Sequence, residues 1–104
     1  MILAKNEDLK DKVIVITGGG GVICSAIAEG FCEAGAKVAL LNLSMEAAQA
    51  KATDLTNKGY IAKAYQCNVL KKDELENVHQ AILRDLGPCD VLINGAGGNN
   101  ARAN

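Results

Sequence analysis

The sequence predicts an α/β fold, a doubly wound parallel sheet with helices on both of its faces. Apolar, β-branched runs that are typical of buried parallel strands alternate with segments whose apolar residues recur at helical spacing. Each helical segment ends at a glycine shortly before the next strand. Because short connections between such units form right-handed crossovers, we expect four parallel strands in one sheet, in the order 3-2-1-4.

The first helix lies between the first two strands. Residues 12–17 and 37–42 are continuous apolar runs, as in strands that are buried on both faces. Residues 22–34 are predicted to be helical, and Gly35 ends this helix. Its apolar face consists of Ile23, Ile27, Phe31 and Ala34.

The second helix and the third strand follow the same pattern. Ser44 can cap a helix that ends at Gly59, and residues 60–65 form the third strand. The apolar side of this helix consists of Ala48, Ala52 and Leu55.

The third helix and the fourth strand complete the pattern. The helix begins near Lys72 and ends at Gly87 and Pro88. Its apolar face consists of Leu75, Val78, Ile82 and Leu86. Residues 89–94 are the fourth strand, at an open edge of the predicted sheet. Because an apolar parallel strand normally has two neighbours, we expect the chain to be truncated after this strand.

Composition excludes several classes of protein. The chain has 104 residues, the size of one domain, and 49% of them are apolar and 22% charged, so it can build a core. A net charge of -1 argues against nucleic-acid binding, and Phe31, Tyr60 and Tyr65 are too few for a base-stacking surface. No run approaches the roughly 20 apolar residues of a membrane helix, and charges interrupt the N-terminal segment, unlike a signal peptide. We expect a cytoplasmic protein that binds neither nucleic acid nor membranes.

The cysteines and the single histidine do not indicate a metal site. Cys24, Cys32, Cys67 and Cys89 form no Cys-x-x-Cys pair, and their spacing suits neither a zinc site nor a disulfide scaffold. We therefore expect no metal ligands and small, buried cysteines in a reducing compartment. His79, in the third helix, is expected at the surface and not as a catalytic base.

The strongest functional signal is a run of four glycines, residues 18–21, between the first strand and the first helix. Glycine lets the backbone approach a bulky anion closely, and the N–H groups at the helix N-terminus carry a partial positive charge. A flexible turn is the alternative, but glycine costs backbone entropy, so such a run needs a reason. The run therefore predicts that a dinucleotide diphosphate binds at this turn.

Motifs at three places together resemble the short-chain dehydrogenase/reductase family. Residues 17–24 resemble its Thr-Gly-x-x-x-Gly-x-Gly loop, residues 67–69 its Asp-Val pair, and residues 92–97 its Asn-Asn-Ala-Gly motif. The resemblance implies a Rossmann-like domain, partial here, of which residues 1–104 are the N-terminal dinucleotide-binding part. It also implies an oxidoreductase that interconverts a carbonyl and an alcohol by hydride transfer with NAD or NADP. We expect this protein to be a homo-oligomer.

The chain departs from the family's motifs in several places. Val22 and Cys24 stand at the second and third glycines of the loop, Asn68 replaces the Asp, and Gly95 replaces the second Asn. Val22 places a branched side chain where that glycine lets the pyrophosphate approach, so we expect the phosphate contacts to shift to the preceding two glycines.

Two segments also indicate a group within the family. The glycine run continued through Val22 to Cys24 (residues 18–24) and residues 97–99 resemble sugar-acid reductases of the D-mannonate oxidoreductase kind. Their chain commonly continues Asn-His-Pro, where this chain has Asn99, Asn100 and Ala101. Acyl-carrier-protein ketoreductases are the alternative.

The loop and the resemblance together assign twelve residues to the dinucleotide. They are Gly18, Gly20, Gly21, Val22, Ile23, Asn42, Leu43, Asn68, Val69, Asn94, Ala96 and Gly97. Asn68 and Val69 would border the adenine, and Asn94, Ala96 and Gly97 the ribose and nicotinamide. Asn42 stands where dinucleotide folds commonly place an acidic residue on the ribose hydroxyls. It can still bond hydroxyls, and no neighbouring cation favours a 2′-phosphate, so we expect NAD in preference to NADP.

The residues that the family uses for chemistry are missing from this sequence. The resemblance implies a Tyr four residues before a Lys, but at that spacing Tyr60 precedes Ala64 and Tyr65 precedes Val69. Both tyrosines are expected to pack on the third strand. We therefore assign no catalytic residue and expect the chain alone to be inactive. The alternatives are a dinucleotide-binding module without chemistry and a degenerate fragment that lends its fourth strand to a partner.

Overall fold

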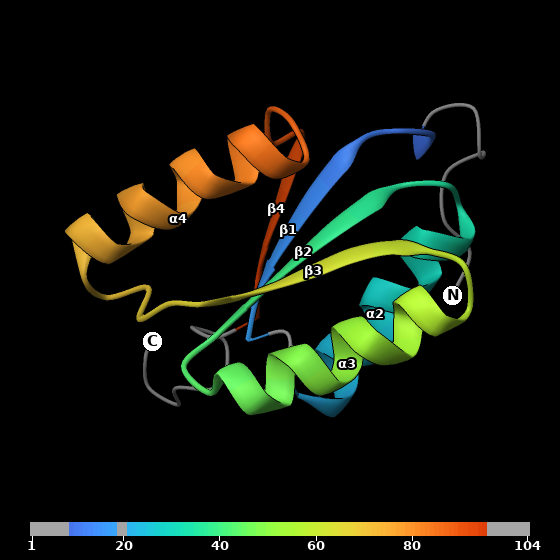
Figure 1. The fold of residues 1–104 in the computed structure, drawn as a ribbon, viewed down its shortest axis with the longest axis horizontal. Helices are drawn as coiled ribbons and strands as arrows, with labels where there is room; N and C mark the ends of the chain where they lie inside the picture. The colour runs from blue at the N-terminus through green and yellow to red at the C-terminus, as the bar shows by residue number, and fades with distance from the viewer. Residues whose placement is uncertain (1–8, 19–20, 96–104) are drawn as a thin grey trace.

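The computed structural model describes residues 9–18 and 21–95, which form one parallel sheet and three helices. The sheet has four strands in the order β3-β2-β1-β4, and this confirms the predicted fold class (Figure 1). The elements are β1 (Val13–Thr17), α2 (Val22–Glu33), β2 (Lys37–Asn42), α3 (Met45–Asn57), β3 (Ile61–Gln66), α4 (Lys72–Asp85) and β4 (Val91–Asn94).

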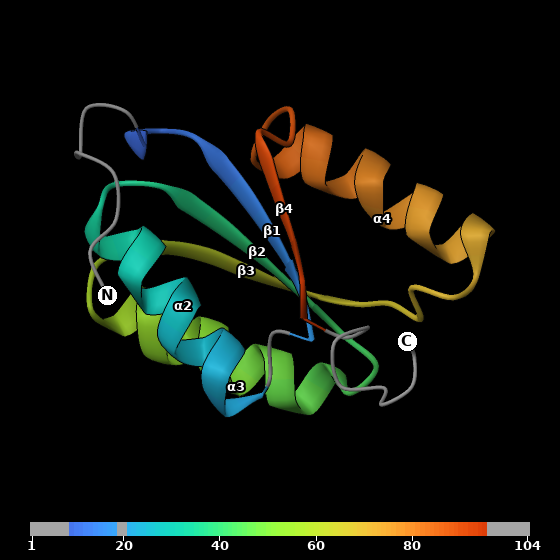
Figure 2. The same ribbon diagram turned by 180° about the vertical axis from the view of Figure 1, so that it is seen from behind.

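Helices cover both faces of the sheet. Helices α2 and α3 lie on one face and α4 on the other, as the two opposite views show (Figures 1 and 2). Strand β1 is buried throughout because its alternate residues face two different cores. Ile14 and Ile16 belong to the core under α2 and α3, whereas Val13 and Val15 belong to the core under α4.

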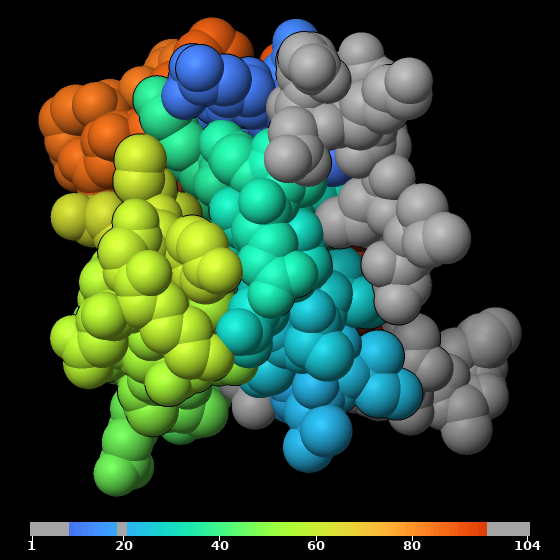
Figure 3. Space-filling model, turned by 90° about the vertical axis from the view of Figure 1, so that its right-hand side faces the viewer, coloured from blue at the N-terminus to red at the C-terminus, as the bar shows by residue number. Residues whose placement is uncertain are grey.

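The predicted apolar face of α3 is confirmed, and that of α2 is partly wrong. Ala48, Ala52 and Leu55 are at most 2% exposed. In α2 the buried residues are Ala28 and Cys32. Their small side chains let this helix pack closely against the sheet and alongside α3 (Figure 3).

The outer residues of the predicted α2 face are not deeply buried. Ile27 and Phe31 are half-buried at the margin of the core, and Ala34 is buried just after the helix. Ile23 is 75% exposed, because it lies in the first turn, where no element of the described chain covers it. The helical spacing was therefore correct, but the buried stripe is rotated toward the smaller residues.

Helix α4 buries only one residue fully, Ile82. Val78 and Leu86 are half-buried against the core, and Leu75 is 39% exposed. The predicted apolar face therefore points toward the core, but most of its residues are only partly buried. An open, mainly apolar pocket of about 420 Å³ lies beside this helix; its lining includes Leu75, His79 and Leu92.

Glycines end the three helices as predicted. Gly35, Gly59 and Gly87 follow α2, α3 and α4 with φ angles of 94°, 92° and 117°. This left-handed conformation favours glycine because a side chain would be strained there.

Strand β4 pairs with β1 in the register Ile14↔Val91 to Thr17↔Asn94. Within residues 9–18 and 21–95 no strand pairs with its other edge. Val91 and Leu92 are 36% and 62% exposed. The strand thus forms an open edge in the described part of the chain.

The cysteines depart from their predicted burial. All four are free; Cys32 and Cys67 are buried, Cys24 is half-buried and Cys89 is exposed. The prediction of small, buried cysteines is therefore wrong for Cys89, which lies in the exposed connection between α4 and β4.

Candidate functional site

The carboxyl ends of all four strands lie at the same edge of the sheet, because the strands are parallel. Helices α2 and α3 begin at this edge (Figure 1). In open α/β sheets, ligands bind in the crevice beyond the carboxyl ends of the strands. The candidate residues of the described chain that were predicted from the sequence lie along this edge or in the turns that leave it.

The turn after β1 is built on glycine. Gly18 has a φ of 75°, and its N–H donates to the carbonyl oxygen of Leu41 at 2.7 Å. The N–H of Gly21 donates to the carbonyl oxygen of Gly18 at 3.1 Å, which closes the turn. Gly20 lies outside the described residues.

Gly21 is the N-cap residue of α2 and supplies no side-chain cap. The first turn of α2 contains no acidic residue, whereas those of α3 and α4 contain Glu46 and the pair Asp73 and Glu74. The first N–H groups of a helix have no partner within the helix, and the helix dipole makes this end partly positive. The N-terminus of α2 is thus suited to an external anion.

Two apolar side chains at this helix end face solvent. Val22 is 88% exposed and Ile23 is 75% exposed. The isopropyl group of Val22 therefore does not fill the turn formed by the described glycines.

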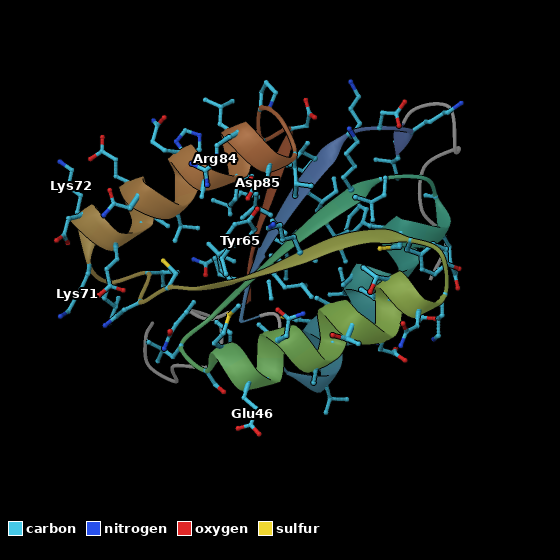
Figure 4. The ribbon with its side chains drawn as sticks, viewed as in Figure 1. Glu46, Tyr65, Lys71, Lys72, Arg84 and Asp85 are labelled. Atoms are coloured by element: carbon cyan, nitrogen blue, oxygen red, sulfur yellow. The ribbon has the colours of Figure 1, made fainter. Side chains whose placement is uncertain are left out.

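Asn42 and Leu43 follow β2. The side-chain nitrogen Nδ2 of Asn42 donates to the carbonyl oxygen of Ser44 at 3.3 Å, so its Oδ1 is the atom suited to accept from a ligand hydroxyl. Leu43 is 67% exposed. Glu46 projects from the start of α3, away from the sheet (Figure 4). From Asn42 to Glu46 the chain supplies no cation.

Asn68 connects β3 to α4. Its Oδ1 accepts from the N–H of Leu70 at 3.0 Å, and its own backbone N–H donates to Glu74 Oε1 at 3.0 Å. Val69 is half-buried against the core under α4. The side chain of Asn68 thus shapes the turn that leads into α4.

Thr17 and Asn94 join the ends of β1 and β4. The hydroxyl of Thr17, which is only 4% exposed, donates to Asn94 Oδ1 at 2.9 Å. Asn94 was predicted from the sequence as a site residue, whereas this role of Thr17 was not. The predicted adjacency of the first and fourth strands indicates that their ends lie close together, but the pairing of Thr17 with Asn94 depends on the register of the two strands. Ala96 and Gly97 lie outside the described residues.

The tyrosines and the histidine have other surroundings. Tyr65 is buried, as predicted, and its hydroxyl donates to Asp85 Oδ2 at 2.9 Å, which ties β3 to the end of α4 (Figure 4). Burial raises the pKa of Tyr65, and the bond to Asp85 raises it further. Tyr60 packs at the margin of the core, and His79 is exposed.

The described residues contain neither a metal-binding cluster nor a helix that could cross a membrane. No group of three or more His, Cys, Asp or Glu side chains in residues 9–18 and 21–95 is placed to hold a metal ion. In the same part of the chain, no helix combines the length and apolar character needed to span a bilayer.

Known proteins share this sequence pattern. The family model described as short chain dehydrogenase matches residues 12–104. An uncharacterized oxidoreductase of Haemophilus influenzae is 47% identical over 103 residues, which cover 99% of this chain and 36% of that protein. A sorbose reductase of Candida albicans is 44% identical over 90 residues, which cover 86% of this chain and 32% of the reductase.

Solved structures share the fold. A candidate D-mannonate oxidoreductase of Haemophilus with bound NAD has a TM-score of 0.84 at 47% identity, over 91% of this chain and 34% of that one. Xylitol dehydrogenase bound to NAD+ has a TM-score of 0.77 at 32% identity, over 81% of this chain and 32% of that one. The chain spans about a third of the length of these relatives. The fold and the match over residues 12–104 show that the chain belongs to the short-chain dehydrogenase family of oxidoreductases.

Proposed function

We propose that this chain is the dinucleotide-binding part of an oxidoreductase that interconverts a carbonyl and an alcohol. The observation that carries the proposal is the N-terminus of α2, which has a glycine cap and no acidic residue in its first turn, at the carboxyl edge of the sheet. A bound dinucleotide would supply the hydride acceptor or donor. The NAD-bound relatives support this assignment.

The main-chain groups of the glycine turn fit a diphosphate. In this proposal Gly20, Val22 and Ile23 present N–H groups to it. Gly21, whose N–H donates to the carbonyl oxygen of Gly18, lies beside the diphosphate as the glycine cap of α2. Gly18 contributes its φ of 75°, because its own N–H already donates to Leu41. The exposed side chains of Val22 and Ile23 would then border the dinucleotide.

The side chains at the other strand ends fit the rest of a dinucleotide. Asn42 and Leu43 would contact the adenosine ribose, where Asn42 Oδ1 accepts from a hydroxyl. Asn68 and Val69 would border the adenine. Asn94, with Ala96 and Gly97, would line the ribose and nicotinamide side.

We propose NAD as the preferred cofactor. A 2′-phosphate beside Asn42 would meet the exposed, apolar Leu43, and no cation from residue 42 to residue 46 would balance its charge. Asn42 can accept a hydrogen bond from a free ribose hydroxyl, as the acidic residue common at this position would. Tighter binding of NADPH than of NADH would contradict this preference.

A sugar acid or a related polyhydroxy compound is the proposed substrate class for the whole protein. The names of the relatives support it: a candidate D-mannonate oxidoreductase, a sorbose reductase and a xylitol dehydrogenase. We propose a homo-oligomer in the cytoplasm, the latter because four free cysteines suit a reducing compartment. We assign the chemistry to residues outside this chain, since no Tyr precedes a Lys by four residues within it.

A titration tests dinucleotide binding directly. NADH added to the chain should show a saturable rise in nicotinamide fluorescence, and ADP should reverse it by competing for the diphosphate site. A folded chain that gives no saturable signal, or a signal that ADP does not affect, would refute the proposal.

A second measurement separates the enzyme from a binding module without chemistry. The gene should encode, after residue 104, a Tyr four residues before a Lys. A gene that ends at residue 104 would favour the binding module, and absence of NADH binding as well would favour a degenerate fragment.

A further inference from the structure

Two departures from the family's motifs lie against each other in the structure. Cys24 is in the first turn of α2, where the family has its third loop glycine, and Gly95 directly follows β4, where the family has Asn. The sulfur of Cys24 lies 3.8 Å from the carbonyl oxygen of Thr17. A Cβ atom placed on Gly95 would overlap this sulfur and would come within 2.7 Å of the same carbonyl oxygen.

The space beside Gly95 is therefore already filled by the thiol. Distances below about 3 Å between a Cβ and other heavy atoms are not tolerated, so no other residue fits at position 95 without movement. The sulfur can be removed by substitution, whereas the Thr17 carbonyl belongs to β1 and is fixed by the sheet. Without the sulfur, residue 95 can move into the space it leaves, and this relieves the second contact as well.

The thiol lies where α2, β1 and β4 come together at the candidate site. Cys24 and Ile93 pack against the same core, and the sulfur reaches the end of β1. Thr17 is in turn bonded to Asn94 at the end of β4. The orientation of the first turn of α2 relative to β1 and β4 thus depends on the sizes of the side chains at positions 24 and 95.

We infer that Cys24 and Gly95 act as one coupled pair, in which the thiol positions the first turn of α2 and Gly95 provides the space for it. The inference rests on the proposed function, because it assigns the diphosphate to that turn and the nicotinamide side to the residues after β4. Cys24 is a positioning residue in this account. It follows that a side chain at position 95 requires a smaller residue at position 24.

A double-mutant cycle tests the pair. Gly95→Ala, Cys24→Ala and the double variant are each titrated with NADH, and their thermal unfolding is followed by circular dichroism. We expect Gly95→Ala alone to weaken NADH binding about tenfold. When Cys24→Ala is already present, Gly95→Ala should weaken binding less than about threefold, because the effects of substitutions at contacting residues are not additive. The Cys24→Ser variant, which keeps a side chain of nearly the same size, should bind NADH like the parent chain.

Gly59→Ala is the matched control. Gly59 has a φ of 92°, and no atom of residues 9–18 and 21–95 lies within 4 Å of the added Cβ, so this change strains the backbone after α3 without crowding. It should lower the unfolding temperature and leave NADH affinity unchanged, which separates loss of stability from loss of positioning.

Each outcome decides the inference. The inference would be overturned if Gly95→Ala lowered NADH affinity by the same factor in the parent chain and in the Cys24→Ala variant. It would also be overturned if the Gly95→Ala chain bound NADH like the parent. If Gly95→Ala alone does not fold, recovery of folding in the double variant supports the pair and failure to recover contradicts it. If the parent chain does not bind NADH, the proposed function fails, and the unfolding temperatures of the cycle still test the pair.

Discussion

Replacing the cap of α2 with a carboxylate gives the sharpest test of the diphosphate site. Gly21 has φ -79° and ψ 163°, which any residue can adopt, and among the described residues a Cβ there would meet only the carbonyl oxygen of Gly18, at 3.5 Å. Gly21→Asp is therefore sterically allowed. Its carboxylate would accept from the N–H groups of the first turn, as an N-cap aspartate does.

The substitution should change stability and binding in opposite directions. Capping gains a few tenths of a kcal/mol over glycine, and a negative charge at a helix N-terminus adds about 0.3–1 kcal/mol. A total of about 0.6–1.3 kcal/mol raises the melting temperature of a domain of this size by about 2–10 °C. The same carboxylate occupies the proposed phosphate position and repels the diphosphate, so NADH affinity should fall at least about tenfold, or about 1.4 kcal/mol.

Gly21→Asn is the matched control, because asparagine caps as well as aspartate but carries no charge. Thermal unfolding by circular dichroism and NADH titration would be measured on both variants. Gly21→Asn should gain stability and lose less affinity than Gly21→Asp, and added salt should narrow the difference. A folded Gly21→Asp chain with the affinity of the parent would refute the placement of the diphosphate at α2.

Three other predictions concern the cofactor, acid stability and the open strand edge. Leu43→Arg should raise the affinity for NADPH relative to NADH about tenfold in parallel titrations, because it adds a cation where none lies; an unchanged ratio would place the ribose elsewhere. The hydrogen bond from Tyr65, and secondarily the cations Lys63 and Arg84, lower the pKa of Asp85. The ionised Asp85 therefore stabilises the folded chain fully above the ordinary carboxyl pKa, and this contribution is lost as pH falls through the lowered pKa. Urea midpoints of the parent and Tyr65→Phe should differ at neutral pH and converge in acid; a difference that grows in acid would contradict this. The chain should self-associate through β4, and Leu92→Lys should shift it to monomer in sedimentation, since lysine on an edge strand opposes pairing; a parent chain that stays monomeric at high concentration would contradict this.

Local patterns were enough to predict the sheet and the ends of the helices. The apolar run in β1 and the glycines at positions 35, 59 and 87 each act through the backbone conformation of a few neighbouring residues. The rotation of α2 was not predictable in the same way. Ile23 fits the helical spacing, but the helix turns the smaller Ala28 and Cys32 to the sheet, and this depends on packing against elements that are distant in sequence.

In the candidate site, the positions of some residues could be predicted from the sequence, but their contacts could not. Asn42 and Asn94 could be placed at the sheet edge because parallel strands end together. The bond from Thr17 to Asn94 requires the register of β1 and β4, and the contact between Cys24 and Gly95 requires the position of a helix over a strand. Neither register nor helix position is encoded in a short motif, so the sequence alone could name the positions but not their contacts.

The shallow attachment of α4 has a consequence for how a ligand would be held. This helix buries one residue fully, whereas α3 buries three. Helices with little buried apolar area open locally at a lower free energy, so amide hydrogens of α4 should exchange with solvent sooner than those of α3. Asn68 and Val69 lead directly into α4, and the proposed adenine contacts would therefore adjoin a helix that opens more readily than α3. The diphosphate turn follows β1, whose residues are buried on both faces and should exchange last.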